Sequence, residues 1–172
     1  MEQKLFLSWL AGLIDGDGCF SITVKIENER IRIGQQVRVA LKENDDWILK
    51  EIQEKTNIGK VYYSNKGKPN GICSWQTVSY RDAIKITELL IPYLKLKHDK
   101  AVKFLKALKL MNGSKKKIKG KRKKGVFLRD KETYLKIIKI ATTLNNDRQT
   151  KRYREYKNYD YWSKKLDEIF KA

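Results

Sequence analysis

Apolar and polar residues alternate along the first part of this chain with the period of a β-strand. Apolar side chains stand at every second position from Phe20 to Ile26, and the same spacing returns from Ile31 to Val39. This spacing is typical of strands that are buried on one face only. A turn near Asn28-Glu29 would join the two strands into a hairpin, and Gly34-Gln35 allow a bend or bulge in the second.

A second hairpin and several helices are predicted farther along the chain. The hairpin runs from Val61 to Ser64 and from Ile72 to Tyr80, around a loop at 65–71 that is rich in turn residues. Helices are predicted from Asn44-Asp45-Asp46 to Gly59, from Arg81 to Ile91, from His98 to Met111, from about Tyr134 onward and around 161–170. Two hairpins, each followed by a helix, indicate an α+β fold in which a four-stranded antiparallel sheet packs on helices.

The N-terminal helix ends in the most unusual stretch of the chain, Leu10 to Gly18, which reads L-A-G-L-I-D-G-D-G. Gly12 and Gly16 share one helix face, where another backbone could approach closely. Each glycine costs a helix about 1 kcal/mol relative to alanine, which suggests that this approach is needed. Asp17 lies at the helix end, where the helix dipole disfavours a carboxylate unless a cation is nearby. Two such helices side by side would pair their Asp17 carboxylates, and paired carboxylates favour Mg²⁺ or a similar hard ion.

Other interpretations of this stretch are open. An Asp-Gly-Asp-Gly sequence is often only a tight turn. A calcium-binding EF-hand is excluded because Cys19 and Phe20 stand where a third oxygen ligand and a glycine are needed. The apolar run is too short to span a bilayer, and no small-residue cleavage site follows it, so secretion is not expected.

Composition points to a nucleic-acid partner. The 172 residues suit a single domain, and 39 Lys and Arg against 20 Asp and Glu leave a formal charge of +19. Binding to a polyanion would be driven largely by counterion release. A membrane surface is the weaker alternative, because no basic amphipathic helix stands alone. Two cysteines, Cys19 and Cys73, are too few for a zinc site and suggest a reducing, intracellular compartment, cytoplasmic or organellar.

The stretch from Leu10 to Gly18 resembles the signature of the LAGLIDADG homing endonucleases and departs from it only at Gly16, where the signature has alanine. The resemblance implies an αββαββα domain over residues 1–172, with a basic loop at about 113–126 and additional C-terminal helices at about 130–170. In the family, paired signature helices form the interface between subunits or domains. Their residue matching Asp17 holds the catalytic metal, Mg²⁺ or another divalent cation such as Mn²⁺, with help from the carbonyl matching Gly16. The implied interface residues are Leu10, Ala11, Gly12 and Asp15.

A second segment with active-site character is Pro92 to Lys97. It resembles the family segment that carries a basic residue near the scissile phosphate, and the match falls on Lys97, which could stabilise developing negative charge. The alternative is a solvated lysine at a helix start. Another family position, usually glutamine or lysine, is matched here by Leu41, which departs from the family pattern. The adjacent Lys42 is suggested as a phosphate contact.

The polar face of the predicted sheet fits DNA recognition. Its Arg, Gln, Ser and Thr side chains are of the kinds that hydrogen-bond base edges, and an antiparallel ribbon can enter the major groove. A merely solvated sheet face is the alternative. By resemblance, the base-reading positions are Ser21, Thr23, Lys25, Arg32, Gln36, Arg38, Tyr62, Ser64, Ser74 and Gln76. Arg148, Lys151 and Arg152 fall in a polar loop that touches phosphates in the family, and the basic run 115–124 could add nonspecific affinity.

The signature occurs once, whereas an active site of this family needs two signature helices. The chain is therefore expected to form a homodimer that cuts both strands of a long, near-palindromic DNA target. Two other classes within the family remain open. A maturase would bind intron RNA, with or without DNA cleavage, and a transcriptional regulator would bind DNA without cutting it. The intact Asp15 and Asp17 argue against the regulator.

Overall fold

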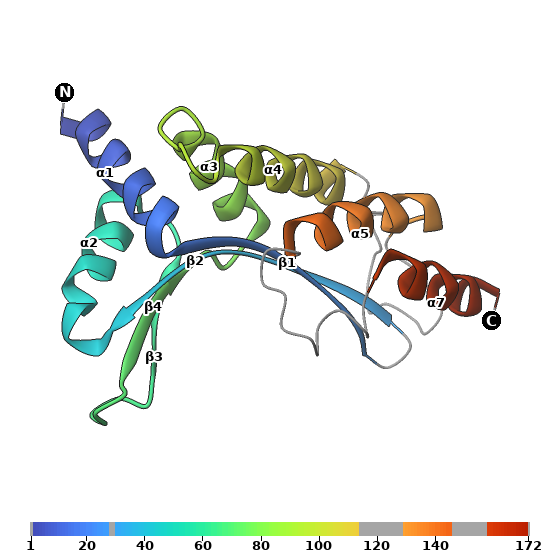
Figure 1. Cartoon of the computed structure of the whole chain (residues 1–172), viewed down its shortest axis with the longest axis horizontal. Helices are drawn as coiled ribbons and strands as arrows, with labels where there is room; N and C mark the ends of the chain where they lie inside the picture. Colours follow the sequence, from blue (N-terminus) through green and yellow to red (C-terminus); the bar gives the residue numbers. More distant parts are fainter. Residues whose placement is uncertain (1, 28–29, 114–128, 146–157, 172) are drawn as a thin grey trace. The chain divides into compact units, whose positions relative to one another are not determined.

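A computed structural model gives the structure of residues 2–27, 30–113, 129–145 and 158–171 (Figure 1). In chain order the elements are α1 (Glu2–Asp17), β1 (Gly18–Glu27), β2 (Arg30–Lys42), the 3₁₀ helix η1 (Glu43–Asp45), α2 (Asp46–Thr56), β3 (Lys60–Ser64), β4 (Ile72–Gln76), α3 (Tyr80–Leu90), α4 (His98–Gly113), α5 (Lys131–Asn145) and α7 (Tyr159–Lys171). The strands form one sheet in the order β1-β2-β4-β3. This is the α+β architecture with a four-stranded antiparallel sheet that the sequence predicts.

The chain divides into two compact units. The first holds residues 1–20 and 35–105, and the second holds residues 21–34 and 106–172. Strands β1 and β2 each begin in one unit and end in the other. The single domain predicted for residues 1–172 stays a prediction.

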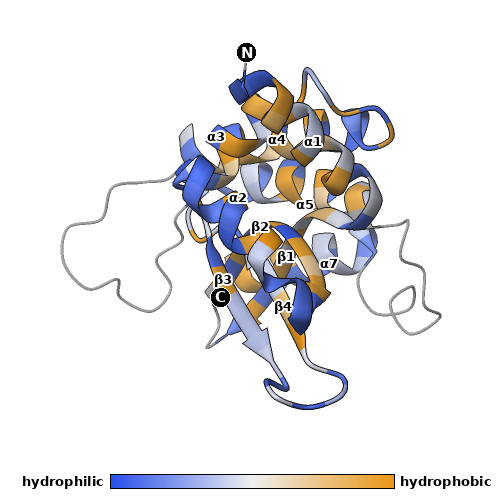
Figure 2. Ribbon diagram, turned by 90° about the vertical axis from the view of Figure 1, so that its left-hand side faces the viewer, coloured by the Kyte–Doolittle hydropathy of each residue, from blue (hydrophilic) through white to orange (hydrophobic). Residues whose placement is uncertain are grey.

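In the first unit, antiparallel pairing divides apolar from polar side chains. Val39 lies opposite Trp75, which in turn lies opposite Val61, and this row belongs to the apolar face. The alternation of hydrophobic and hydrophilic residues along the strands can be followed in Figure 2. Helix α2 contacts β3 and β4, and α1 contacts α3. The largest fully buried side chains of the unit are Trp75, Phe20, Phe104, Leu10, Ile14, Leu49, Ile52, Ile86 and Leu90.

The chain passes from α1 directly into β1, with no loop between them. Gly18 makes this possible, since a Cβ at that position would lie only 2.7 Å from the Cα of Ile14. No ordinary side chain fits there without displacing the end of the helix. The last residue of α1, Asp17, is thereby fixed at the junction of helix and sheet.

Two of the predicted boundaries that differ from the structure have a clear local cause. Strand β4 ends at Gln76 rather than Tyr80, because the Ser79 side chain accepts the N–H of Asp82 and begins helix α3 with a capping box. Helix α2 ends at Thr56 rather than Gly59, because Asn57 adopts a left-handed conformation with φ of 50°.

In the second unit, α5 and α7 contact each other. The rings of Tyr134 and Phe170 meet edge to face with centroids 6.2 Å apart, and Lys131 pairs with Asp167. Arg129 is buried, and its Nη2 donates to the Met111 carbonyl in the last turn of α4 at 2.5 Å. The helices predicted from about Tyr134 and around 161–170 are confirmed as α5 and α7. Among the described residues, no helix has both the length and the apolar character needed to cross a membrane.

Candidate active site

The side chain of Asp15 turns back onto its own chain. One carboxylate oxygen accepts the backbone N–H groups of Lys95 at 2.7 Å and Leu96 at 3.1 Å, and the other accepts the N–H of Lys97 at 2.9 Å. Partial burial raises the pKa of Asp15, but the three N–H groups and the Lys97 charge outweigh it, and the pKa is lowered overall. Asp15 is therefore ionised at neutral pH and fully engaged.

The side chain of Lys97 in turn contacts the end of α1. Its ammonium donates to the carbonyls of Ile14 at 2.8 Å, Asp15 at 2.5 Å and Gly16 at 3.1 Å. The last carbonyls of a helix have no partner within the helix, so Lys97 caps α1 and also places a positive charge at the negative end of its dipole. Burial lowers the pKa of Lys97, and the charge of Asp15 opposes that shift.

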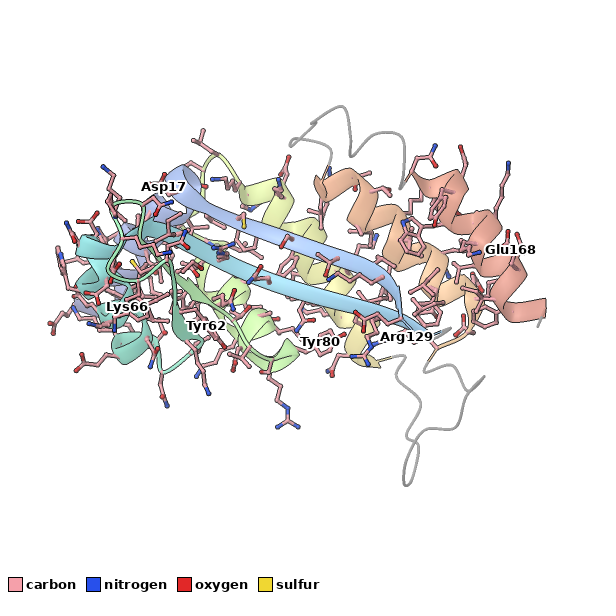
Figure 3. The ribbon with its side chains drawn as sticks, turned by 90° about the horizontal axis from the view of Figure 1, so that it is seen from below. Asp17, Tyr62, Lys66, Tyr80, Arg129 and Glu168 are labelled. Atoms are coloured by element: carbon pink, nitrogen blue, oxygen red, sulfur yellow. The ribbon has the colours of Figure 1, made fainter. Side chains whose placement is uncertain are left out.

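Asp17 differs from Asp15 in having its carboxylate exposed. Within the described part of the chain it accepts no hydrogen bond and joins no ion pair, although its charge acts on Lys97. Figure 3 labels Asp17 where α1 meets β1. The Asp17 carboxylate and the neighbouring Gly16 carbonyl are hard oxygen donors of the kind that Mg²⁺ prefers. Among the described residues, no group of three or more His, Cys, Asp or Glu side chains could hold a metal within one chain.

One face of α1 is open along its length. A Cβ at Gly12 or Gly16 would meet no described residue within 4 Å. Leu5 is 67% exposed and Trp9 is 43% exposed, although both are large and apolar. These four residues fall on one helix face, which we call the α1 outer face.

The other predicted interface residues face inward. The side chains of Leu10 and Ala11 are fully buried in this chain's own core, which leaves them no side-chain surface for a partner. Asp15 is engaged with residues 95–97. Of the four residues, Gly12 alone lies on the α1 outer face.

The polar face of the first unit brings together seven of the predicted DNA-reading residues. In the strand register, Arg38 lies opposite Gln76, Lys42 opposite Ile72, and Tyr62 opposite Ser74. Figure 3 labels Tyr62 on β3. The seven residues on this face are Gln36, Arg38, Lys42, Tyr62, Ser64, Ser74 and Gln76.

Two features of this face bear on recognition. The Gln36 side-chain amide donates to the Gln76 side-chain oxygen, so the two amides orient each other. The Arg38 Nε is buried and has no hydrogen-bond partner among the residues that the structure describes. An unsatisfied buried donor is costly, and an acceptor from a ligand would relieve that cost.

Sequence reasoning missed Lys60, because it began the strand at Val61. Lys60 is exposed and lies opposite Gln76, so it belongs to the same polar face. The alternation of Lys60, Tyr62 and Ser64 was the available signal.

The remaining predicted contacts lie elsewhere. Ser21, Thr23 and Lys25 alternate with buried Ile22 and Val24 along β1 in the second unit. Arg32, in the same unit, pairs with Glu27 at 2.8 Å. Leu41 lies opposite Cys73 on the apolar face, while Lys42 is exposed. Arg148, Lys151, Arg152 and the basic run 115–124 lie outside the described residues.

Comparison with known proteins identifies the family. Residues 10–111 match the LAGLIDADG endonuclease family. Over 118 residues the chain is 30% identical to the DNA endonuclease I-CvuI of Chlorella vulgaris, and the alignment covers 66% of this chain and 70% of that protein. This chain therefore belongs to the LAGLIDADG endonuclease family.

Solved structures share the fold. I-CvuI bound to the I-CreI target in the presence of Mg, with the DNA not cleaved, gives a TM-score of 0.77 at 18% identity, over 98% of this chain and 96% of that one. The archaeal intron-encoded homing endonuclease I-Vdi141I, complexed with DNA, gives a TM-score of 0.76 at 17% identity, over 99% of each chain. At such low sequence identity, these structural similarities establish the fold of this chain and nothing further.

Proposed function

We propose that this chain is a site-specific DNA endonuclease that acts as a homodimer and makes a divalent-cation-dependent double-strand cut in a long, near-palindromic target. The observation that carries the proposal is the end of α1, where the exposed Asp17 carboxylate follows the Gly16 carbonyl, which accepts a hydrogen bond from the Lys97 ammonium. Family membership supports the same activity.

Asp17 and the Gly16 carbonyl would hold the cation, Mg²⁺ or a similar ion such as Mn²⁺. The Gly16 carbonyl already accepts a hydrogen bond from Lys97, but a carbonyl oxygen has a second lone pair. When bound, the cation would supply positive charge to a phosphodiester undergoing hydrolysis. Lys97 adds a fixed positive charge next to Asp17, suited to stabilising negative charge that develops on the phosphate.

The homodimer is proposed from the α1 outer face. Its two glycines let a second backbone approach closely, and Leu5 and Trp9 would be covered on association. In a two-fold symmetric pair the same face meets itself, so each subunit contributes one Asp17 to the same region. Such a pair would read two half-sites related by symmetry, which favours a near-palindromic sequence.

The polar sheet face is proposed to read the DNA. Arg38 has an unsatisfied Nε and could donate to guanine, while the paired amides of Gln36 and Gln76 could recognise adenine. Lys42 is exposed at the end of β2 and suits a phosphate. Ser21, Thr23, Lys25 and Arg32 are proposed contacts of the second unit, and Arg148, Lys151 and Arg152 are proposed phosphate contacts. No observation favours an intron RNA maturase or a regulator over the nuclease.

The test is a selection of cut sites from a randomised DNA library, with Mg²⁺ and with a chelator. The proposal expects recovered sites that share one near-palindromic sequence, and no cutting with the chelator. Cutting without sequence preference would contradict the specificity. Tight DNA binding without cutting would favour the regulator, and binding of an intron transcript without DNA binding would favour the maturase.

A further inference from the structure

The contacts at the end of α1 join two segments that are far apart in the sequence. The Asp15 carboxylate holds three successive backbone N–H groups, those of Lys95, Leu96 and Lys97, and Asp15 and Lys97 are 82 positions apart. Lys97 in turn holds three successive carbonyls, those of Ile14, Asp15 and Gly16. We call these six hydrogen bonds the reciprocal clamp.

The two halves of the reciprocal clamp depend on each other. Residues 91–97 lie between α3 and α4, and the Lys97 carbonyl accepts the N–H of Ala101 in α4 at 2.9 Å, which leaves the N–H groups of residues 95–97 to be held from outside the helix. Asp15 supplies that constraint, since a carboxylate bound by three N–H groups has little freedom left. The Lys97 ammonium is then delivered to the carbonyls at the end of α1.

We propose that Asp15 is a positioning residue, which acts on the reaction through Lys97 and not through a contact of its own with DNA or metal. This inference rests on the proposed nuclease function, because Lys97 matters for cutting only if the chain cuts. Both Asp15 oxygens accept backbone donors within the same chain, and three of the roughly four acceptor sites of the carboxylate are used, which leaves Asp15 less suited than Asp17 to be a ligand. A shift of the 95–97 backbone would move the Lys97 charge away from Asp17 and the scissile phosphate.

The alternative is that Asp15 only stabilises the fold. Asp82 offers a matched control, because its carboxylate also accepts a backbone N–H, that of Ser79 at 3.3 Å, in the cap of α3. Asp82→Asn removes a capping carboxylate from the same unit without touching the reciprocal clamp. The free energy of unfolding of the Asp82→Asn variant should fall while its cleavage rate stays unchanged.

The experiment is a double-mutant cycle with Asp15→Asn, Lys97→Met and the double variant, each checked for folding. DNA affinity and the single-turnover cleavage rate at saturating protein are measured separately. Asp15→Asn replaces one acceptor oxygen with an NH₂ group that opposes the backbone donors. We expect DNA affinity to hold and the cleavage rate to fall by about 10- to 100-fold, the loss typical of a small misplacement of a reacting group. The double variant should cut as slowly as Lys97→Met, within about twofold.

Asp15→Glu keeps two acceptor oxygens and should cut faster than Asp15→Asn, which gives a second variant if the asparagine protein does not fold. Losses from Asp15→Asn and Lys97→Met that multiply in the double variant would overturn the inference, as would an Asp15→Asn protein that cuts like the wild type. A wild-type protein that cuts no DNA would instead refute the proposed function. In that case the free energies of unfolding of the same three variants are measured in urea. Losses that are not additive in the double variant support the reciprocal clamp, and additive losses overturn it.

Discussion

Asp15 and Asp17 stand two residues apart at the end of α1, yet their carboxylates have opposite surroundings. Asp15 accepts three backbone N–H groups, whereas Asp17 is exposed and accepts no hydrogen bond within the described residues. A carboxylate held by backbone donors stabilises structure, and an exposed one at a helix C-terminus is destabilised by the helix dipole unless a cation joins it. Of these two carboxylates, Asp17 is therefore the one that we propose as the cation ligand.

Another residue-scale prediction concerns Tyr63, whose hydroxyl donates to the Asp46 carboxylate at 2.6 Å. This hydrogen bond raises the pKa of Tyr63 above its ordinary value of 10.0. Because the folded pKa is the higher one, the bond stabilises the fold below pH 10.0, and that stability is lost as the pH rises through the folded pKa. Asp46→Asn should bring the Tyr63 pKa back toward 10.0, as read by NMR titration of the labelled ring carbon. An unchanged titration would contradict the contact.

Gly59 gives a residue-scale prediction about stability. Its φ is +77°, and a Cβ there would lie 2.7 Å from both the Gln76 carbonyl and the Trp75 indole nitrogen. Gly59→Ala should therefore lower the free energy of unfolding by about 1–3 kcal/mol in urea, through backbone strain and crowding. Gly67→Ala is the matched control, since φ is +74° there but a Cβ would meet nothing within 4 Å. Equal losses for the two variants would show that the crowding at Gly59 costs nothing.

At the scale of elements, α1 contributes one face to the core and exposes the opposite face. Its buried face, with Leu10 and Ile14, belongs to the core, and its outer face carries Gly12 and Gly16 with nothing against them. Glycine in an exposed helix interior is destabilising within one chain. The cost is accounted for if a second α1 packs on this face, because a residue without a side chain lets two helix backbones approach closely.

The matching prediction is that Gly12→Leu prevents dimerisation without harming the fold. A Cβ at Gly12 would meet no described residue within 4 Å, and leucine should raise helix propensity, so the unfolding transition of the monomer should be retained or shifted upward. Sedimentation velocity should change from dimer to monomer, and DNA cutting should be lost with it. Gly113→Leu, at another open helical glycine, should remain a dimer. A dimer that survives Gly12→Leu would place the interface elsewhere.

Sequence periodicity predicted the elements better than it predicted their contacts. Alternation and helix period depend on neighbouring residues, so the two hairpins and α3, α4, α5 and α7 were foreseen. The boundaries of β4 and α2 were missed, because the side-chain cap at Ser79 and the left-handed backbone of Asn57 decided them. The roles of Asp15, Leu10 and Ala11 depend on partners distant in the sequence, and no local pattern encodes those contacts. The resemblance of Leu10–Gly18 to the signature supplied Asp17, and the structure supplied what surrounds it.

At the scale of the whole molecule, net charge determines how the affinity for DNA depends on salt. The formal charge of +19 implies that DNA binding releases many counterions. The measured affinity should fall on the order of a thousandfold or more between about 50 and 200 mM salt. Lys42→Ala should weaken binding to all sequences alike and reduce the salt slope by about one, whereas Arg38→Ala should cost about 1–3 kcal/mol and relax specificity at one base pair. An affinity independent of salt would contradict this account.

The most direct test of the proposed function is the comparison of wild type with Asp17→Asn on a single DNA target, in Mg²⁺ and in chelator. Asparagine keeps the shape of the side chain and removes the charge that would hold the cation. We expect the wild type to make a double-strand cut in Mg²⁺, and Asp17→Asn to bind the same DNA as tightly without cutting it. Glu54→Gln, which neutralises an exposed carboxylate on α2, should cut as the wild type does. Cutting by Asp17→Asn at the wild-type rate would contradict the central claim.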